Sequence, residues 1–384
     1  MNLLAEDIKR ICLFSKQIMN ETAVLNFRIN NSTKMKTSVS ILIVLALLMV
    51  GSCNEGNIYQ HATSINRNDF KTTQSLIGSV VQFDNELLKP THLQVFDSLL
   101  FTINTREERT IHIFDLKAKR KIGERITAGN GPGEMLQPRI VKVDKESIQI
   151  FDIATSTLFE YSMSDFVANP KPIVLRKIKL DKSTASEAYL LGEHLIGAVY
   201  NPSYQLNSYN LNGKKVGEYG SYPNSDVVFS DSEKLESYRF SFITNLNDKM
   251  LICYNWTDLI DILDKDGHLE KRLHGPEHFI SLFKEFHEGD VISANSMKGQ
   301  TRDAYFSPVS VGNDFFVLYS GKSEDEEGYS ILANQIFVFS WKGVPEQILS
   351  LDQGVFSITV DEKNKKIYGI SDTPEFHIVE FAYK

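Results

Sequence analysis

Three observations in the sequence predict an all-β protein, a six-bladed β-propeller. From residue 76 onward helical periodicity is scarce, and short β-rich runs are separated by Asn, Asp and Gly turns. The runs fall into groups of four that repeat about every fifty residues, which is the period of a propeller blade. The last group has three runs, whereas one strand stands alone before the first group. We therefore expect one N-terminal and three C-terminal strands to share a blade, a 1+3 strand closure.

A lipoprotein signal peptide is predicted at residues 35–52, ahead of the propeller. Two lysines flank Met35, and an unbroken apolar run follows from residue 41 to residue 50. Ten residues span only about 15 Å as a helix, half of the roughly 30 Å of a bilayer core, so this run is too short for a stable membrane span. The run ends in Val50-Gly51-Ser52-Cys53, which resembles the bacterial lipobox. That resemblance implies that Cys53 carries acyl chains such as palmitate and begins the mature protein.

We expect a misassigned extension before the signal peptide and a flexible tether after it. Residues 1–34 precede the basic start of the signal, so we interpret Met35 as the true start and residues 1–34 as a misassigned extension. A genuine cytoplasmic extension is the alternative. Residues 53–74 are polar and poor in strands, and we expect a flexible tether there. Some lipoproteins carry a sorting Asp directly after the lipidated cysteine, whereas this sequence has Asn54. The absence of that Asp favours the outer membrane, so we expect a lipid-anchored protein of the cell envelope.

The propeller is predicted over residues 75–384. The first strand of each group begins near His92, Arg139, Ala188, Arg239, Tyr305 and Val355. The spacing between the fourth and fifth starts is longer than the others, which indicates one insertion. We expect the lone strand at residues 75–84 to pair with the blade formed by residues 355–384, because an open ring would leave two unpaired edges. Two β-sandwich domains are the structural alternative, but they would not explain one period and one lone strand.

A glycine-rich turn at a blade junction, AGNGPGEMLQPRIVKVD, runs into a β-strand. A nucleotide-binding glycine loop would open a helix that carries Lys and Ser or Thr, and this loop does not. The pattern resembles NHL-type propeller repeats, on the residues Gly129, Gly131, Gly133, Glu134, Met135, Pro138 and Asp144. Together with the lipobox and six blades, residues 35–384 resemble the TolB-like six-bladed propeller lipoproteins of Bacteroidetes. The resemblance implies a fold and an envelope location, and it supplies no reaction.

Composition and motifs favour a binding platform over an enzyme. The formal net charge is −8, and no basic stripe carries interleaved aromatics, so nucleic acid is not an expected partner. HExxH and GxSxG patterns are absent, and Pro276 between His274 and His278 argues against a helical metal pair. We expect no catalytic residues, no metal and no cofactor in a monomeric protein. A periplasmic lyase or hydrolase related to NHL-type enzymes is the alternative function.

Three blades begin with an arginine, and these arginines define the predicted ligand site. Arg139, Arg239 and Arg302 each stand at the entry to a first strand, and first strands line the channel of a propeller. Guanidinium groups there can bind a carboxylate or phosphate bidentately, with the backbone N–H groups of Gly131 and Gly133 as neighbouring donors. We therefore predict a small anionic ligand, or an acidic side chain of an envelope protein, at the channel mouth. Three aromatic residues are further candidate contacts: Tyr204, Trp256 and Tyr305.

Overall fold

A computed structural model of the chain describes residues 59, 61–84, 89–104, 107–182, 185–245, 248–327 and 329–384. All described residues belong to one compact unit, Ile58–Lys384. The predicted extension at residues 1–34, the predicted signal peptide and Cys53 lie outside the described residues.

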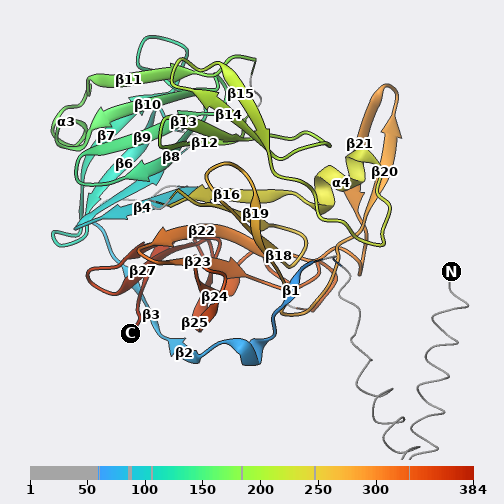
Figure 1. Cartoon of the computed structure of the whole chain (residues 1–384). Helices are drawn as coiled ribbons and strands as arrows, with labels where there is room; N and C mark the ends of the chain where they lie inside the picture. Colours follow the sequence, from blue (N-terminus) through green and yellow to red (C-terminus); the bar gives the residue numbers. More distant parts are fainter. Residues whose placement is uncertain are drawn as a thin grey trace, which may run out of the picture. The chain divides into compact units, whose positions relative to one another are not determined.

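Six sheets form the blades of a six-bladed propeller, each with four antiparallel strands, and two of them gain a fifth, parallel strand at the outer edge (Figure 1). The first three blades follow one another in sequence order without crossovers. Blade 1 contains β4 (His92–Phe96), β5 (Leu99–Ile103), β6 (Arg109–Asp115) and β7 (Arg120–Thr127). Blade 2 contains β8 (Pro138–Val143), β9 (Ser147–Asp152), β10 (Thr157–Ser162) and β11 (Val174–Lys179). Blade 3 contains β12 (Glu187–Leu191), β13 (His194–Ala198), β14 (Leu206–Asn210) and β15 (Lys215–Tyr219).

The last three blades carry the N-terminal segment in addition to their own strands. Blade 4 contains β16 (Phe240–Thr244), β17 (Met250–Tyr254), β18 (Leu259–Leu263) and β19 (Leu269–His274). Blade 5 contains β22 (Tyr305–Val311), β23 (Asp314–Tyr319), β24 (Ala333–Ser340) and β25 (Pro345–Val355). Blade 6 contains β26 (Ser357–Asp361), β27 (Lys366–Ser371), β28 (His377–Ala382) and β3 (Gly78–Val81). The predicted first strands are confirmed to within two residues, and the two-sandwich alternative is wrong.

The core lies between the blades, because each sheet buries apolar side chains against the next sheet. Blades 1 and 2 share a cluster that includes Phe101 and Ile150, and corresponding clusters join each following pair of blades. The last cluster packs Leu93 and Leu100 of blade 1 against Tyr368 and Ile370 of blade 6. Side-chain packing therefore continues around the whole ring.

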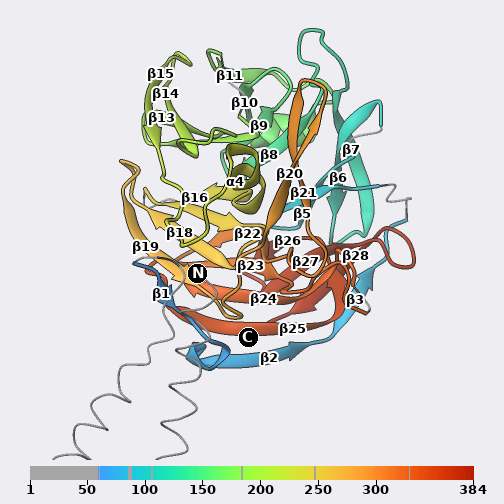
Figure 2. The same ribbon diagram turned by 90° about the vertical axis from the view of Figure 1, so that its right-hand side faces the viewer.

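Residues 61–76 form a strap along the outer edges of two blades, which corrects the prediction of a flexible tether at residues 53–74. β1 (Thr63–Ser64) pairs in parallel with β19, and β2 (Thr72–Leu76) pairs in parallel with β25. The short helix η1 (Arg67–Asp69) lies between them. Figure 2 shows β1, β2 and β3 following the rim of the C-terminal blades. Although residues 61–76 are mostly polar, three apolar side chains of this strap are buried against the blades: Ile65, Phe70 and Leu76.

The predicted insertion between blades 4 and 5 is a hairpin of β20 (Phe283–Glu288) and β21 (Val291–Ser296). It projects beside the helix α4 (Asp231–Ser237) (Figure 1). Ser230 caps α4 by accepting the N–H of Glu233, and the Ser232 hydroxyl donates to Glu285 on the hairpin at 2.8 Å. A second short helix, α3 (Met163–Ala168), follows β10. Within the described residues no helix has the length and apolar character needed to cross a bilayer.

Candidate functional site

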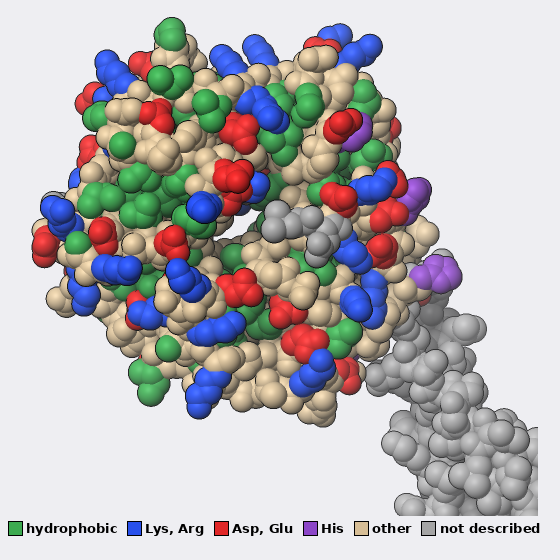
Figure 3. Space-filling view, turned by 60° about the vertical axis from the view of Figure 1, so that its left-hand side comes forward, with side chains coloured by type: hydrophobic (Ala, Val, Ile, Leu, Met, Phe, Trp, Pro, Cys, Tyr) green, Lys and Arg blue, Asp and Glu red, His purple; other side chains and the backbone are tan. Residues whose placement is uncertain are grey.

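A channel of about 900 Å³ runs along the propeller, lined by side chains of the first strands of all six blades. Figure 3 shows the hollow at the centre of the ring, with charged side chains of both signs around it. Because each sheet has the same strand order, every first strand enters from the same face. The volume is within the range of about 300–1,000 Å³ that small-molecule sites occupy.

Arg139, the second residue of β8, lines this channel. Its Nε lies 3.2 Å from Oε2 of Glu187 at the start of β12, and the Arg139 side chain is 41% exposed. Glu187 is buried, and its carboxylate also accepts the N–H of Phe242 at 3.0 Å and the hydroxyl of Tyr189 at 3.3 Å. Glu187 raises the pKa of the Arg139 guanidinium. Glu187 therefore fixes the orientation of Arg139 from the neighbouring blade and leaves the rest of its guanidinium accessible.

Arg239 packs on Tyr200, and the charges of both Arg239 and Arg139 act on the Tyr200 hydroxyl. The Arg239 guanidinium carbon is 5.7 Å from the centroid of the Tyr200 ring, and its Nη2 lies 2.8 Å from Oε1 of Glu236. Burial raises the pKa of the Tyr200 hydroxyl, and the charges of Arg239 and Arg139 oppose this shift. Tyr200 is 47% exposed, an unusual exposure for a large aromatic residue in this fold. The two arginines and the tyrosine thus form one cluster beside the channel, in which Arg139 lines the channel and Arg239 and Tyr200 adjoin it.

Arg302 has a different environment from the other two arginines. Its guanidinium lies 3.2 Å from Oε1 of Glu326, donates to the carbonyl of Gly321 at 3.2 Å, and lies over the ring of Phe279. Arg302 stands ahead of β22 on the entry face, but it is not among the residues that line the channel. Of the three predicted arginines, only Arg139 lines the channel, and Arg239 adjoins it through Tyr200.

The glycine-rich turn joins β7 to β8 but does not supply donors to the channel. Glu134 folds back so that its Oε2 accepts the N–H of Gly131 at 2.8 Å, and its own N–H donates to the Gly131 carbonyl. Gly133 has a φ of 80°, a conformation that favours glycine. Met135 is buried between blades 1 and 2. Gly131 and Gly133 do not line the channel, because the turn satisfies its own backbone and anchors a blade junction.

Of the three predicted aromatic contacts, Tyr305 is wrong because its side chain is fully buried and its hydroxyl donates to the carbonyl of Gly275. Tyr204 accepts a hydrogen bond from Lys215 at 3.0 Å, and Trp256 packs on Phe283. Both are half-buried, and neither lines the channel. The aromatic residues that do lie at the mouth, Tyr189 and Tyr200, were missed. Alternation along β12 points Tyr189 to the same side as Glu187, which is the signal that could have found it.

His92 lines the channel at the start of β4. Burial, followed by the positive charge of Arg139, lowers its pKa to about 3. Above that pH the imidazole is neutral, so His92 acts in the channel as an uncharged hydrogen-bonding group.

This lowered pKa predicts a specific acid sensitivity. Between an unfolded pKa of about 6.5 and the folded value, the unfolded chain binds a proton that the folded chain does not. The stability contributed by His92 is therefore present above about pH 6.5 and is lost as the pH falls. We expect the melting temperature of His92→Gln to fall less than that of the wild type when the pH is lowered from 7 to 5. Equal losses in thermal unfolding scans at the two pH values would show that His92 is not held neutral.

Other histidines have structural partners. His274 Nε2 lies 3.2 Å from Oδ1 of Asp258, and both side chains are buried in blade 4. His278 Nε2 lies 2.6 Å from the hydroxyl of Ser64 in the strap. No group of three or more His, Cys, Asp or Glu side chains in the described ranges is arranged to hold a metal ion.

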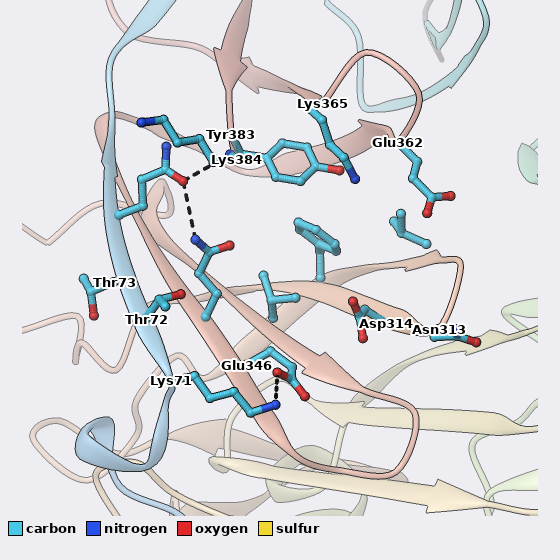
Figure 4. Close-up of a pocket in the computed structure, with 15 residues that line it drawn as sticks. Lys71, Thr72, Thr73, Asn313, Asp314, Glu346, Glu362, Lys365, Tyr383 and Lys384 are labelled. Carbon is cyan, nitrogen blue, oxygen red and sulfur yellow. Dashed lines mark hydrogen bonds and ion pairs between the residues drawn. The ribbon is translucent and has the colours of Figure 1, made fainter.

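A second cavity of about 690 Å³ lies where β2 meets blades 5 and 6 (Figure 4). Lys71 forms an ion pair with Glu346, and Gln74 Oε1 accepts from the side chain of Gln347 at 3.4 Å and from the N–H of Lys384 at 3.2 Å. Burial raises the pKa of Asp314, which faces the same hollow. The polar contacts of this cavity hold the strap to the C-terminal residues.

Comparison with known proteins agrees with the architecture. The family described as TolB-like 6-blade propeller-like matches residues 67–363. The chain belongs to this TolB-like propeller family. None of the curated proteins matches the sequence. The Bacteroidetes lipoprotein type and the NHL-type motif stay predictions.

Two solved bacterial structures resemble this TolB-like propeller. One is a member of the DUF4221 family from Bacteroides vulgatus, with a TM-score of 0.52, 12% identity, and coverage of 80% of this chain and 97% of that chain. The other is a putative exported protein from Bacteroides fragilis, with a TM-score of 0.48, 11% identity, and coverage of 84% and 98%. At such low identity the first likeness shows the fold alone.

Proposed function

We propose that this protein is a lipid-anchored envelope protein whose propeller binds a ligand at the mouth of its channel. The observation that carries the proposal is the cluster of Arg139, Arg239 and Tyr200 beside a channel of about 900 Å³. The Arg139 and Arg239 side chains are 41% and 42% exposed, and each is held by a carboxylate, so both are oriented before a ligand arrives. Preorganised donors of this kind bind oxygen acceptors at a lower entropic cost.

The ligand must present oxygen acceptors to these guanidinium groups. The anionic group expected from the sequence, on a small molecule or on an envelope protein, is one such acceptor. The membrane contact rests on the lipobox at Val50–Cys53, and Asn54 favours the outer membrane. We further propose that a monomer performs this binding without catalysis.

We also propose that β3 closes the ring. β3 pairs antiparallel with β28, in the register Gly78↔Phe381 to Val81↔Ile378. Its pairing covers an edge that β28 would otherwise expose. A closed ring holds the first strands of blades 2, 3 and 4 at fixed distances, and those strands carry or adjoin Arg139, Glu187 and Arg239.

Ligand retention tests the proposed function. The full-length protein, purified from its own envelope in mild detergent, should retain a small molecule that native mass spectrometry detects. We expect Arg139→Ala combined with Arg239→Ala to weaken binding of that molecule by roughly 2–4 kcal/mol, because two charge-assisted bonds are lost. Arg176→Ala is the matched control, because Arg176 pairs with Glu160 on the outer part of blade 2. Equal affinity in the double variant and the control would exclude the channel mouth as the site.

A further inference from the structure

Among the described residues, the lining of the channel is formally neutral, although it contains charged side chains. Its charged lining side chains are Arg139, Lys142, Asp144 and Glu187. They form two ion pairs, Arg139–Glu187 at 3.2 Å and Lys142–Asp144 at 2.7 Å. At the mouth, Arg239 is likewise compensated by Glu236. An anionic ligand would therefore meet no net positive charge and would leave the site with an excess negative charge.

The remaining polar lining consists of neutral groups that donate and accept hydrogen bonds. Residues with amide or hydroxyl side chains line the channel from five blades, although the Gln149 amide also donates to Glu160: Gln94, Gln149, Ser241, Ser307, Ser310 and Ser357. Half-buried aromatic side chains, Tyr189, Phe306 and Phe356, lie among them. Tyr200 adds an exposed ring at the mouth. A matching ligand has uncharged hydroxyl groups around its edge and apolar C–H faces that pack on aromatic rings.

We propose that the channel binds a neutral saccharide, an inference that rests on the proposed function and names its ligand class. A sugar hydroxyl accepts from the accessible N–H groups of Arg139 and donates onward to a neighbouring amide or hydroxyl oxygen. Glu187 acts as a positioning residue, because its carboxylate is only 6% exposed and is already bonded to Phe242 and Tyr189. A carboxylate or phosphate ligand would instead be placed beside this buried negative charge.

The first test compares three classes of probe with the wild-type protein. The probes are an array of neutral oligosaccharides built from hexoses, pentoses and N-acetylhexosamines, trigalacturonic acid, and inorganic phosphate. We expect saturable binding of at least one neutral oligosaccharide, at least about tenfold tighter than that of the two anions. Failure of every neutral oligosaccharide overturns the saccharide inference. If the protein still retains an envelope molecule that depends on Arg139 and Arg239, the proposed function survives that failure.

The second test changes the charge of the channel at one position. Glu187→Gln keeps the size of the side chain and its acceptor for the Phe242 N–H, but it leaves Arg139 uncompensated. We expect the affinity for trigalacturonic acid to rise at least about tenfold, because one unit of negative charge next to the ligand is removed. The neutral oligosaccharide should bind more weakly, because Arg139 loses its fixed orientation. The exposed ion-pair variant Glu270→Gln is the control and should change neither affinity.

Unchanged trigalacturonic acid binding in Glu187→Gln would show that channel charge does not select the ligand, and it would overturn the inference. Circular dichroism and thermal unfolding of each variant separate this result from a failure to fold.

Discussion

Deleting the chain through Asp84 should abolish cooperative folding of the propeller. This truncation removes the strap and β3, and with them the buried side chains of Ile65, Phe70 and Leu76. Burial of three such side chains contributes about 5–9 kcal/mol. A domain of this kind has a total stability of about 5–15 kcal/mol, so the loss is comparable with the whole. The deletion also exposes the backbone edge of β28.

A shorter truncation separates the strap from β3. Deletion through Ile77 removes β1 and β2 but keeps the pairing of β3 with β28. We expect this variant to fold with a lowered melting temperature, whereas a chain that begins at Tyr59 should melt like the longest form. A flexible tether at residues 53–74 implies that removal of residues up to Gln74 is harmless, and the burial of Ile65 and Phe70 reverses that expectation. Identical melting of all three truncations would contradict the proposed closure.

Changing Cys53→Ser should release the protein from the membrane. A bacterial lipoprotein cysteine carries two or three acyl chains, and a single chain already gives marginal, reversible binding. Loss of all chains should move the protein from the membrane fraction to the soluble fraction and should leave the signal sequence uncleaved at Cys53. Fractionation followed by N-terminal sequencing measures both effects.

The other two cysteines provide controls for this change. Cys12 lies in the predicted upstream extension, and Cys253 is buried in β17. Cys12→Ser and Cys253→Ser should both remain in the membrane fraction. Retention of Cys53→Ser in that fraction would mean that the apolar run at residues 41–50, and not lipid, holds the protein there.

The blade pattern could be predicted from the sequence because it is local. Alternating apolar residues and Asn, Asp and Gly turns recur at each blade, and they located first strands such as β4 and β22 without error. The strap could not be predicted in this way. Its strands pair in parallel with partners 210 and 275 residues away, and its apolar anchors are too widely spaced to form a pattern.

The candidate site was predicted only in part for a similar reason. Arg139 follows from its position at the start of β8, but its partner Glu187 belongs to the next blade, and nothing local in the sequence links them. Tyr305 stands at the start of β22, yet its ring packs against Tyr319 and Phe337 of its own blade, and its hydroxyl donates to the carbonyl of Gly275 at the end of blade 4. The position of a residue along a strand could be predicted from the sequence. The residue that it contacts in the neighbouring blade could not, because that contact depends on how the blades assemble into a ring.

A structure of the protein with its retained envelope ligand tests the central claim most directly. The account predicts an oxygen atom of the ligand within about 3 Å of a guanidinium nitrogen of Arg139, with Tyr200 against the ligand at the channel mouth. A ligand seated in the cavity between β2 and blades 5 and 6, or on the β20–β21 hairpin, with the channel mouth free, would contradict it.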